Sequence, residues 1–232
     1  MVLHPRPAVG TEATGAACYH FPVVRQAFPA AVLLALLPLP APAASAAEEL
    51  ARKVEGRHRQ LVDMTARFVQ RYRSGLLGQE IVERGTMSLK QPGRMLWEYR
   101  DPERKTFVSD GSTCWFYVPA DRQVVVRKQG GERGVALDLL SGRMDLLGQF
   151  EPGIETTAAG GRRLRLLPRK PDPDVSAVYL DVDRDGRINA IEILDTQENR
   201  SQFRFENVRE NVGLPDSLFR FEVPPGVEVV SG

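Results

Sequence analysis

The sequence has little cysteine and little histidine, and charge of neither sign is in excess. Its 232 residues include two Cys and three His, and 31 Lys and Arg stand against 30 Asp and Glu, a formal net charge of +1. No Cys and His spacing suits zinc, no serine occupies a nucleophile elbow, and no glycine-rich phosphate loop follows a predicted strand. The sequence therefore predicts a protein that is not an enzyme, uses no cofactor and does not bind nucleic acid.

Long apolar runs are also missing, except for one uncharged stretch near the N-terminus, residues 27–39. Arg25 precedes this stretch, and Ala44-Ser45-Ala46 follows it with the small-x-small pattern of a cleavage site. The stretch is too short to span a bilayer as a helix. We therefore predict that residues 1–46 form an N-terminal extension with a secretory signal peptide that is removed, and that residues 47–232 form one exported domain.

Two helical segments are predicted, over residues 48–73 and 136–150. In each, apolar residues recur every three or four positions with polar residues between them, which is the pattern of an amphipathic helix. The apolar positions of the first are Leu50, Val54, Leu61, Met64 and Phe68, and those of the second are Leu137, Leu140, Met144 and Leu147. His58 falls among arginines on the first segment, so we expect it to be solvated.

About ten short antiparallel strands are predicted from apolar residues that alternate with polar ones between turn residues. The segments are 85–89, 95–99, 105–109, 113–118, 123–128, 162–167, 175–182, 187–195, 201–208 and 218–223. A helix is about 10 Å wide and neighbouring strands lie about 4.8 Å apart, so two helical segments cover fewer than half of these strands. Two outcomes stay open: a sandwich that buries all apolar side chains, or a partial barrel whose concave side accepts an apolar ligand.

Several segments, in the order of the chain, are similar to one protein family. They are Gln91-Pro92-Gly93-Arg94-Met95-Leu96-Trp97-Glu98-Tyr99-Arg100-Asp101-Pro102, Val108-Ser109-Asp110-Gly111, Trp115-Phe116-Tyr117, the hairpin 180–205 and Phe219-Arg220-Phe221-Glu222-Val223-Pro224-Pro225-Gly226-Val227. Together they resemble the outer-membrane lipoprotein carrier family LolA over nearly all of residues 48–230. The resemblance implies a mainly β fold with some helix: a single strongly curved antiparallel sheet, or incomplete β-barrel, covered by a helical lid with an apolar cavity between them.

The resemblance also implies a function. A LolA-like monomer receives acylated lipoproteins from the inner-membrane ABC transporter LolCDE, shields their acyl chains across the periplasm and passes them to an outer-membrane acceptor such as LolB, with transient contact to membrane surfaces. The second interpretation is a LolA-like envelope module that senses lipids or lipoproteins. The predicted cavity-lining residues are Leu61, Met64, Phe68, Met95, Trp97, Tyr99, Phe107, Trp115, Tyr117, Leu140, Ile191 and Ile193.

The family usually has an arginine, where this chain has Gln91, that bonds lid carbonyls and holds the empty carrier closed. Glutamine can donate hydrogen bonds but lacks the charge and the forked geometry of arginine. The resemblance therefore implies a weaker latch through Gln91, or a latch built by another residue such as Arg94.

Residues 181–192 match the spacing of an EF-hand loop. Asp181, Asp183, Asp185 and Glu192 stand at its ligand positions, and Gly186 stands at the turn position. An EF-hand needs a helix on each side, whereas the residues on both sides of this loop alternate as strands do. We therefore favour a solvated hairpin turn, with calcium binding left as the alternative.

Overall fold

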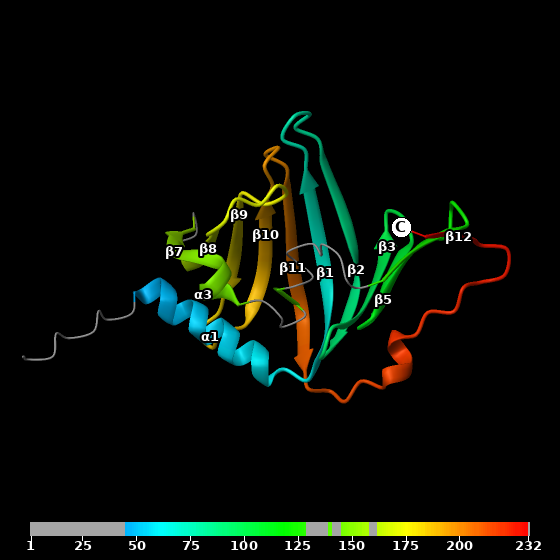
Figure 1. Ribbon diagram of the computed structural model, residues 1–232, viewed down its shortest axis with the longest axis horizontal. Helices are drawn as coiled ribbons and strands as arrows, with labels where there is room; N and C mark the ends of the chain where they lie inside the picture. Colours follow the sequence, from blue (N-terminus) through cyan, green and yellow to red (C-terminus); the bar gives the residue numbers. More distant parts are fainter. Residues whose placement is uncertain (1–44, 129–138, 141–144, 158–161, 232) are drawn as a thin grey trace, which may run out of the picture. The chain divides into compact units, whose positions relative to one another are not determined.

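Twelve strands form one continuous sheet in the part of the chain that the structure describes (Figure 1). This computed structural model describes residues 45–128, 139–140, 145–157 and 162–231. The strands are β1 (Asp63–Arg73), β2 (Glu80–Lys90), β3 (Arg94–Asp101), β4 (Lys105–Asp110), β5 (Thr113–Val118), β6 (Gln123–Lys128), β7 (Phe150–Thr156), β8 (Arg162–Pro168), β9 (Ala177–Val182), β10 (Ile188–Leu194), β11 (Arg200–Glu210) and β12 (Glu228–Ser231). A single sheet excludes the sandwich.

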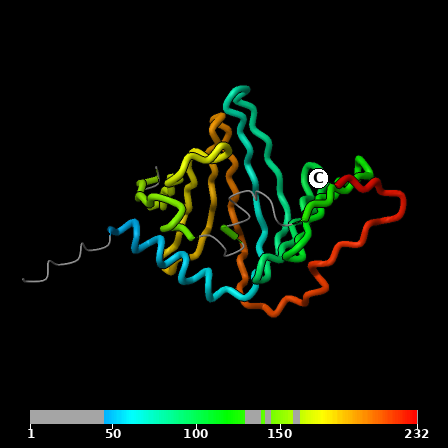
Figure 2. Tube along the Cα trace, viewed as in Figure 1, coloured from blue at the N-terminus to red at the C-terminus, as the bar shows by residue number. Residues whose placement is uncertain are grey.

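The strand order places the first strand in the middle of the sheet. It runs β12-β6-β5-β4-β3-β2-β1-β11-β10-β9-β8-β7. Neighbours pair antiparallel, except that β12 pairs parallel with β6. Figures 1 and 2 show the strands splayed into an open, curved sheet, with the helix α1 (Ala46–Gln60) lying across the end that β7 and β8 form. The predicted single curved sheet is confirmed.

The helix α1 begins and ends at clear signals. Ser45 is its N-cap: the Ser45 hydroxyl accepts from the Glu48 backbone N–H at 3.2 Å, and the Glu48 carboxylate accepts from the Ser45 N–H at 3.3 Å. Acidic residues occupy the first turn and basic residues the last turn, as the helix dipole favours. In the described residues, no helix is long and apolar enough to cross a membrane.

The prediction of one helix over residues 48–73 is wrong in its second half, because α1 ends at Gln60 and β1 begins at Asp63. Met64, Ala66 and Phe68 are buried at every second position, and β1 pairs along its length with β2 and β11. The four-residue step from Met64 to Phe68 fits both a helix and a strand. Pairing on both sides decides in favour of the strand.

Nine of the ten predicted strand segments are confirmed. The segment 218–223 is not a strand, because it contains the end of a short 3₁₀ helix, η1 (Asp216–Phe219), followed by irregular chain. The second predicted helix is interrupted in its described part: residues 139–140 are helical, Asp145 is not, and α3 (Leu146–Gln149) gives way at Phe150 to β7, one of the strands that the sequence pattern missed. Residues 136–138 and 141–144 of that prediction lie outside the described residues.

One face of the sheet is apolar from β7 to β6, and α1 packs on it. We call it the inner face. Residues that pair across neighbouring strands point to the same face of the sheet, and the inner face contains three rows of such residues. The rows are Leu164, Leu180, Ile191 and Phe203; Phe205 and Phe68; and Met87, Trp97, Phe107 and Phe116. Ala51 and Val54 of α1 join the same hydrophobic cluster. The helix therefore stays in place by burying its apolar stripe on this face.

The C-terminal segment covers the opposite, outer face of β3 to β5. Asp63 is 1% exposed, and its carboxylate accepts hydrogen bonds from the backbone N–H groups of Val212, Gly213 and Leu214 at 2.7, 3.0 and 2.9 Å. The segment continues through η1 to Phe219, which is buried, and then to β12. The chain itself thus closes this part of the outer face.

Candidate functional site

Ten of the twelve predicted lining residues lie in or against the hydrophobic cluster of the inner face: seven are buried members, and Tyr99, Phe107 and Ile193 pack against it. The ten are Leu61, Met64, Phe68, Met95, Trp97, Tyr99, Phe107, Leu140, Ile191 and Ile193. Leu61 caps α1 rather than lying within a longer helix, and Met64 and Phe68 lie on β1. They reach the predicted cluster from different elements than the sequence pattern indicated.

Aromatic rings form the centre of the inner face. The Phe68 ring lies edge-on to Trp97 and to Tyr99, with centroids 4.9 Å apart in both pairs, and Trp97 meets Phe203 at 5.6 Å. The Tyr99 hydroxyl donates to the Gln70 side-chain oxygen at 2.8 Å, and burial raises the pKa of that hydroxyl. Among the described residues, the Trp97 indole N–H is buried without a hydrogen-bond partner. This face therefore offers one hydrogen-bond donor that the fold itself does not use.

Trp115 and Tyr117 are not on the inner face, so their assignment to the cavity lining is wrong. Phe107 pairs with Phe116, so the residues on either side of Phe116 point to the outer face. There both rings pack against Phe221 of the C-terminal segment, at centroid distances of 6.3 and 5.7 Å. The prediction placed both rings on the same face of the sheet as Phe107.

The inner face has a hollow at β4, β5 and β6. Its volume is about 340 Å³, and Phe107, Cys114, Phe116, Val125 and Arg127 line it. That volume reaches the lower end of the range of small-molecule sites, about 300–1,000 Å³. Phe116 keeps 38% of its surface exposed there, which is unusual for a large aromatic residue. Of these five residues only Phe107 was predicted to line a cavity; Cys114, Phe116, Val125 and Arg127 were not.

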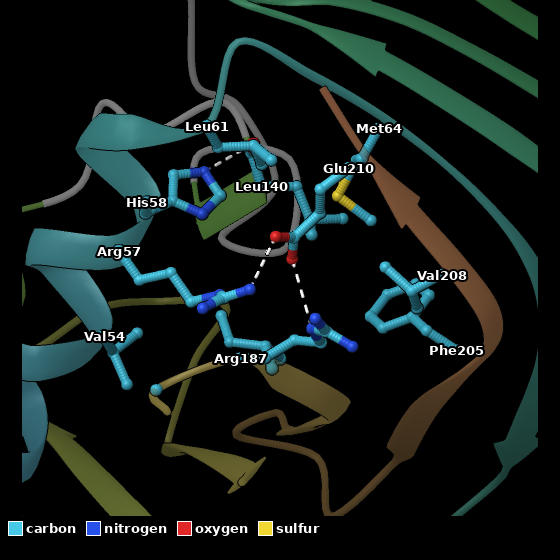
Figure 3. Close-up of a pocket in the computed structure, with 12 residues that line it drawn as sticks. Val54, Arg57, His58, Leu61, Met64, Leu140, Arg187, Phe205, Val208 and Glu210 are labelled. Carbon is cyan, nitrogen blue, oxygen red and sulfur yellow. Dashed lines mark hydrogen bonds and ion pairs between the residues drawn. The ribbon is translucent and has the colours of Figure 1, made fainter. Parts of the chain in front are cut away.

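A second, smaller hollow lies under the last turn of α1 (Figure 3). Its volume is about 30 Å³, too small for an acyl chain. At its rim the Glu210 carboxylate pairs with Arg57 of α1 at 2.6 Å and with Arg187 of the β9–β10 turn at 3.2 Å. The Lys53 ammonium also donates to the Arg184 carbonyl. These contacts fasten α1 to β11 and to the β9–β10 turn.

His58, expected to be solvated, is instead half-buried and hydrogen-bonded to Leu140. Its Nε2 lies 2.8 Å from the Leu140 carbonyl oxygen, and because a carbonyl only accepts, His58 is the donor. The Gln91 amide nitrogen lies 3.4 Å from the same His58 nitrogen. Burial lowers the pKa of His58, outweighing the opposing effects of the Leu140 hydrogen bond and of Glu210. The imidazole is therefore held in its neutral form.

Arg94 does not reach Leu140. Its guanidinium pairs with Asp216 of η1 at 2.9 Å, and Lys90 pairs with the same carboxylate at 2.6 Å. Arg94 thus helps to hold the C-terminal segment on the outer face, and its assignment to a lid latch is wrong.

The EF-hand-like spacing at residues 181–192 belongs to the β9–β10 hairpin. Asp183 accepts from the backbone N–H groups of Asp185 and Arg187 at 2.8 and 2.9 Å. Asp181 pairs with Arg163 at 3.0 Å, and Glu192 pairs with the same arginine at 3.3 Å. Across the described ranges, no three His, Cys, Asp or Glu side chains are grouped so that they could hold a metal ion.

Fold and site together define a one-sheet protein whose apolar face is covered by helix at one end and hollowed at the other. The family model described as "Outer membrane lipoprotein carrier protein LolA" matches residues 59–222. The chain belongs to this family.

Curated relatives and a solved structure agree with this assignment. The chain is 33% identical to the outer-membrane lipoprotein carrier protein of Dechloromonas aromatica over 63% of this chain and 70% of that protein. It is also 33% identical to the protein of that name from Azotobacter vinelandii, over 72% and 81% of the two chains. An uncharacterized conserved protein from Thermus thermophilus shares the fold at 17% identity, with a TM-score of 0.50 over 81% and 100% of the chains.

Proposed function

We propose that this protein carries acylated lipoproteins through the periplasm and shields their acyl chains against its inner face. The observation that supports this most is the apolar inner face itself, which extends from β7 to β6, whereas α1 packs mainly on β7 and β8 and reaches β11 at its last turn. Each methylene removed from water contributes about 0.8 kcal/mol, so even a partly covered groove holds a fatty chain firmly.

The partners in this proposal are those that the family resemblance implies. In this proposal the chain is exported with removal of residues 1–46, works as a monomer, takes its cargo from the inner-membrane transporter LolCDE and delivers it to an outer-membrane acceptor such as LolB. Transfer requires that each next partner holds the acyl chains more tightly than the last. The family name describes a carrier, and a carrier needs binding rather than catalysis. Cleavage after Ala46 would also remove the Ser45 cap of α1.

A photo-crosslinker placed on each face of the sheet tests this proposal. With benzoylphenylalanine at Phe116, which lines the hollow, we expect adducts with acylated lipoproteins in living cells. The matched control is the same crosslinker at Glu98, whose carboxylate accepts from Thr86 Oγ1 on the outer face. Adducts are read as lipoprotein bands of raised mass. Adducts at residue 98 and none at residue 116 would contradict binding on the inner face.

We further propose that the hydrogen bond from His58 Nε2 of α1 to the Leu140 carbonyl is the latch that keeps the empty carrier closed. Arg57, Arg187 and Glu210 face the same pocket. Because burial lowers the folded-state pKa of His58 below its ordinary value of 6.5, the neutral imidazole stabilises the closed form above that pH. This stabilisation is lost as the pH falls below 6.5 and toward the lowered value, where protonation favours a solvated ring.

Release of a fluorescent lipid should therefore speed up several-fold as the pH falls from about 7.5 to about 5.5. The variant His58→Gln keeps a donor but does not titrate, so its release rate should vary much less over that interval. Stopped-flow release into acceptor vesicles measures both proteins. An unchanged pH profile in His58→Gln would show that another group controls release.

A further inference from the structure

The turn between β1 and β2 presents two leucines to solvent. Leu76 is 90% exposed and Leu77 is 67% exposed, more than any other large apolar side chain in the described residues. Figures 1 and 2 show this turn projecting beyond the neighbouring turns at its end of the sheet. Two adjacent leucines that stay outside the core forgo the stabilisation that burial of their side chains would give. Because the hydrophobic core of this fold lies elsewhere, the two exposed leucines do not contribute to its packing.

Four backbone N–H groups of this turn are hydrogen-bonded. The bonds are Ser74 N–H to the Gln79 carbonyl at 3.0 Å, Gly78 N–H to the Ser74 carbonyl at 2.9 Å, Leu77 N–H to Ser74 Oγ at 3.2 Å and Gly75 N–H to Asn199 Oδ1 at 3.0 Å. A Cβ at Gly75 would come within 2.6 Å of the Gln197 carbonyl, so the two neighbouring turns touch. Apolar surroundings tolerate backbone only when its polar groups are satisfied. This turn can thus enter an apolar layer while four of its N–H groups stay bonded.

The charges around the two leucines balance. The flanking ends of β1, β2 and the β10–β11 turn carry Arg71, Arg73, Arg200, Glu80, Asp195 and Glu198, three of each sign. Arg71 and Glu80 pair at 2.8 Å. A tip without net charge gains nothing from an anionic surface, and its apolar side chains suit a neutral one. Two side chains on a narrow turn are also far less than the roughly 1,000 Å² that a stable protein interface buries.

The tip leads to the inner face. Tyr72 pairs with Ile81 next to the turn, four residues along β1 from Phe68, and the even spacing puts both side chains on the inner side of the sheet. Ile81 is 52% exposed. A surface that receives Leu76 and Leu77 therefore lies at the end of the apolar inner face.

We propose that Leu76 and Leu77 insert into the interface of a zwitterionic lipid bilayer and hold this end of the inner face against the membrane. The role in cargo exchange rests on the carrier function proposed above, whereas the bilayer contact does not. Two leucines give weak, reversible binding, which suits a protein that must leave each membrane it visits.

Vesicle flotation tests the bilayer contact. The chain, purified from the periplasm, is mixed with vesicles of phosphatidylcholine and phosphatidylethanolamine that contain no other protein. The double variant L76S/L77S should partition onto vesicles about tenfold less than the parent chain, and L76F/L77F at least as well as the parent. V229S is the matched control, because Val229 is 53% exposed on β12, away from the tip. Raising the salt from about 0.05 to about 0.5 M should change the parent's partitioning less than twofold.

Equal partitioning of the parent and L76S/L77S, equal loss in V229S, or no partitioning of the parent would each overturn the proposal. Normal vesicle binding by L76S/L77S with failed delivery to outer membranes would also overturn it and point to a protein partner. Binding of an acylated peptide in solution separates the two proposals: it should be the same in L76S/L77S and the parent. If neither binds the peptide, the carrier function fails while the bilayer contact stands.

Discussion

Replacing Phe116 by aspartate is expected to lower the affinity for an acylated peptide about a hundredfold, a loss of about 2.7 kcal/mol. The substitution takes an aromatic wall from the hollow at β4 to β6 and puts a carboxylate where the acyl chain would lie. A charge that loses water without gaining a partner is costly. Because Phe116 is already 38% exposed, the free chain keeps its core, and the melting temperature should change little.

Titration of a fluorescent triacylated peptide measures this affinity. The matched control is Val229→Asp, which adds the same charge at an exposed residue of the β6–β12 end of the sheet, on the outer face, since Val229 pairs with Val124. Its affinity should stay within about twofold of the parent. Equal loss in both variants would mean that net charge, and not the hollow, controls binding.

Replacing Asp63 by alanine should lower the free energy of unfolding by about 3 to 5 kcal/mol. Its carboxylate satisfies the backbone N–H groups of Val212, Gly213 and Leu214, and its own carbonyl accepts from the Asn211 N–H at 2.7 Å. Alanine leaves those three donors without an acceptor, each at about 1–3 kcal/mol. The C-terminal segment should then detach from the outer face before the sheet unfolds.

Urea denaturation measures the change, and hydrogen exchange at residues 212–214 locates it. Asp63→Asn keeps one acceptor oxygen and the size of the side chain, so it should lose less stability than Asp63→Ala. A loss below about 1 kcal/mol in Asp63→Ala would show that water replaces the carboxylate and that the buried cap is dispensable.

Strand patterns predicted most of the sheet because its polar and apolar residues alternate between clear turns. Periodicity failed where two periods coincide. The spacing from Leu61 through Met64 to Phe68 fits a helix, yet the long-range pairing of β1 with β11 makes residues 63–73 a strand. No local pattern contains a partner that lies so far along the chain.

The sequence predicted which residues form the site better than it predicted the face of the sheet to which they point. The β4–β5 turn decides which aromatic residues of β5 face inward. In this turn Gly111 has a φ of +96°, and the register of the two strands, extended by one pair, places Asp110 opposite Thr113 with two residues between them. A two-residue turn that starts with glycine would have put Phe107 opposite Phe116. The two-residue turn was visible in the sequence, but the prediction gave more weight to the large side chains of Trp115 and Tyr117.

The contact of His58 with Leu140 could not be predicted from the sequence for another reason. A longer helix places it among solvated arginines, whereas the true end of α1 at Gln60 turns it toward Leu140. The anchoring of Asp63 was equally hidden, because its acceptors are used by backbone groups that lie about 150 residues later in the chain. Tertiary contacts of this kind leave no periodic trace.

The central place of β1 sets the order in which the protein can be completed. Its hydrogen-bonding partners on one side come from β2, the next strand to emerge, but those on the other side come from β11, which reaches back from residues 200–210. Any chain cut short before that strand presents an open row of amide and carbonyl groups along the middle of its apolar surface, an invitation to aggregation. A chain that ends before β11 is therefore expected to aggregate more readily than the complete chain.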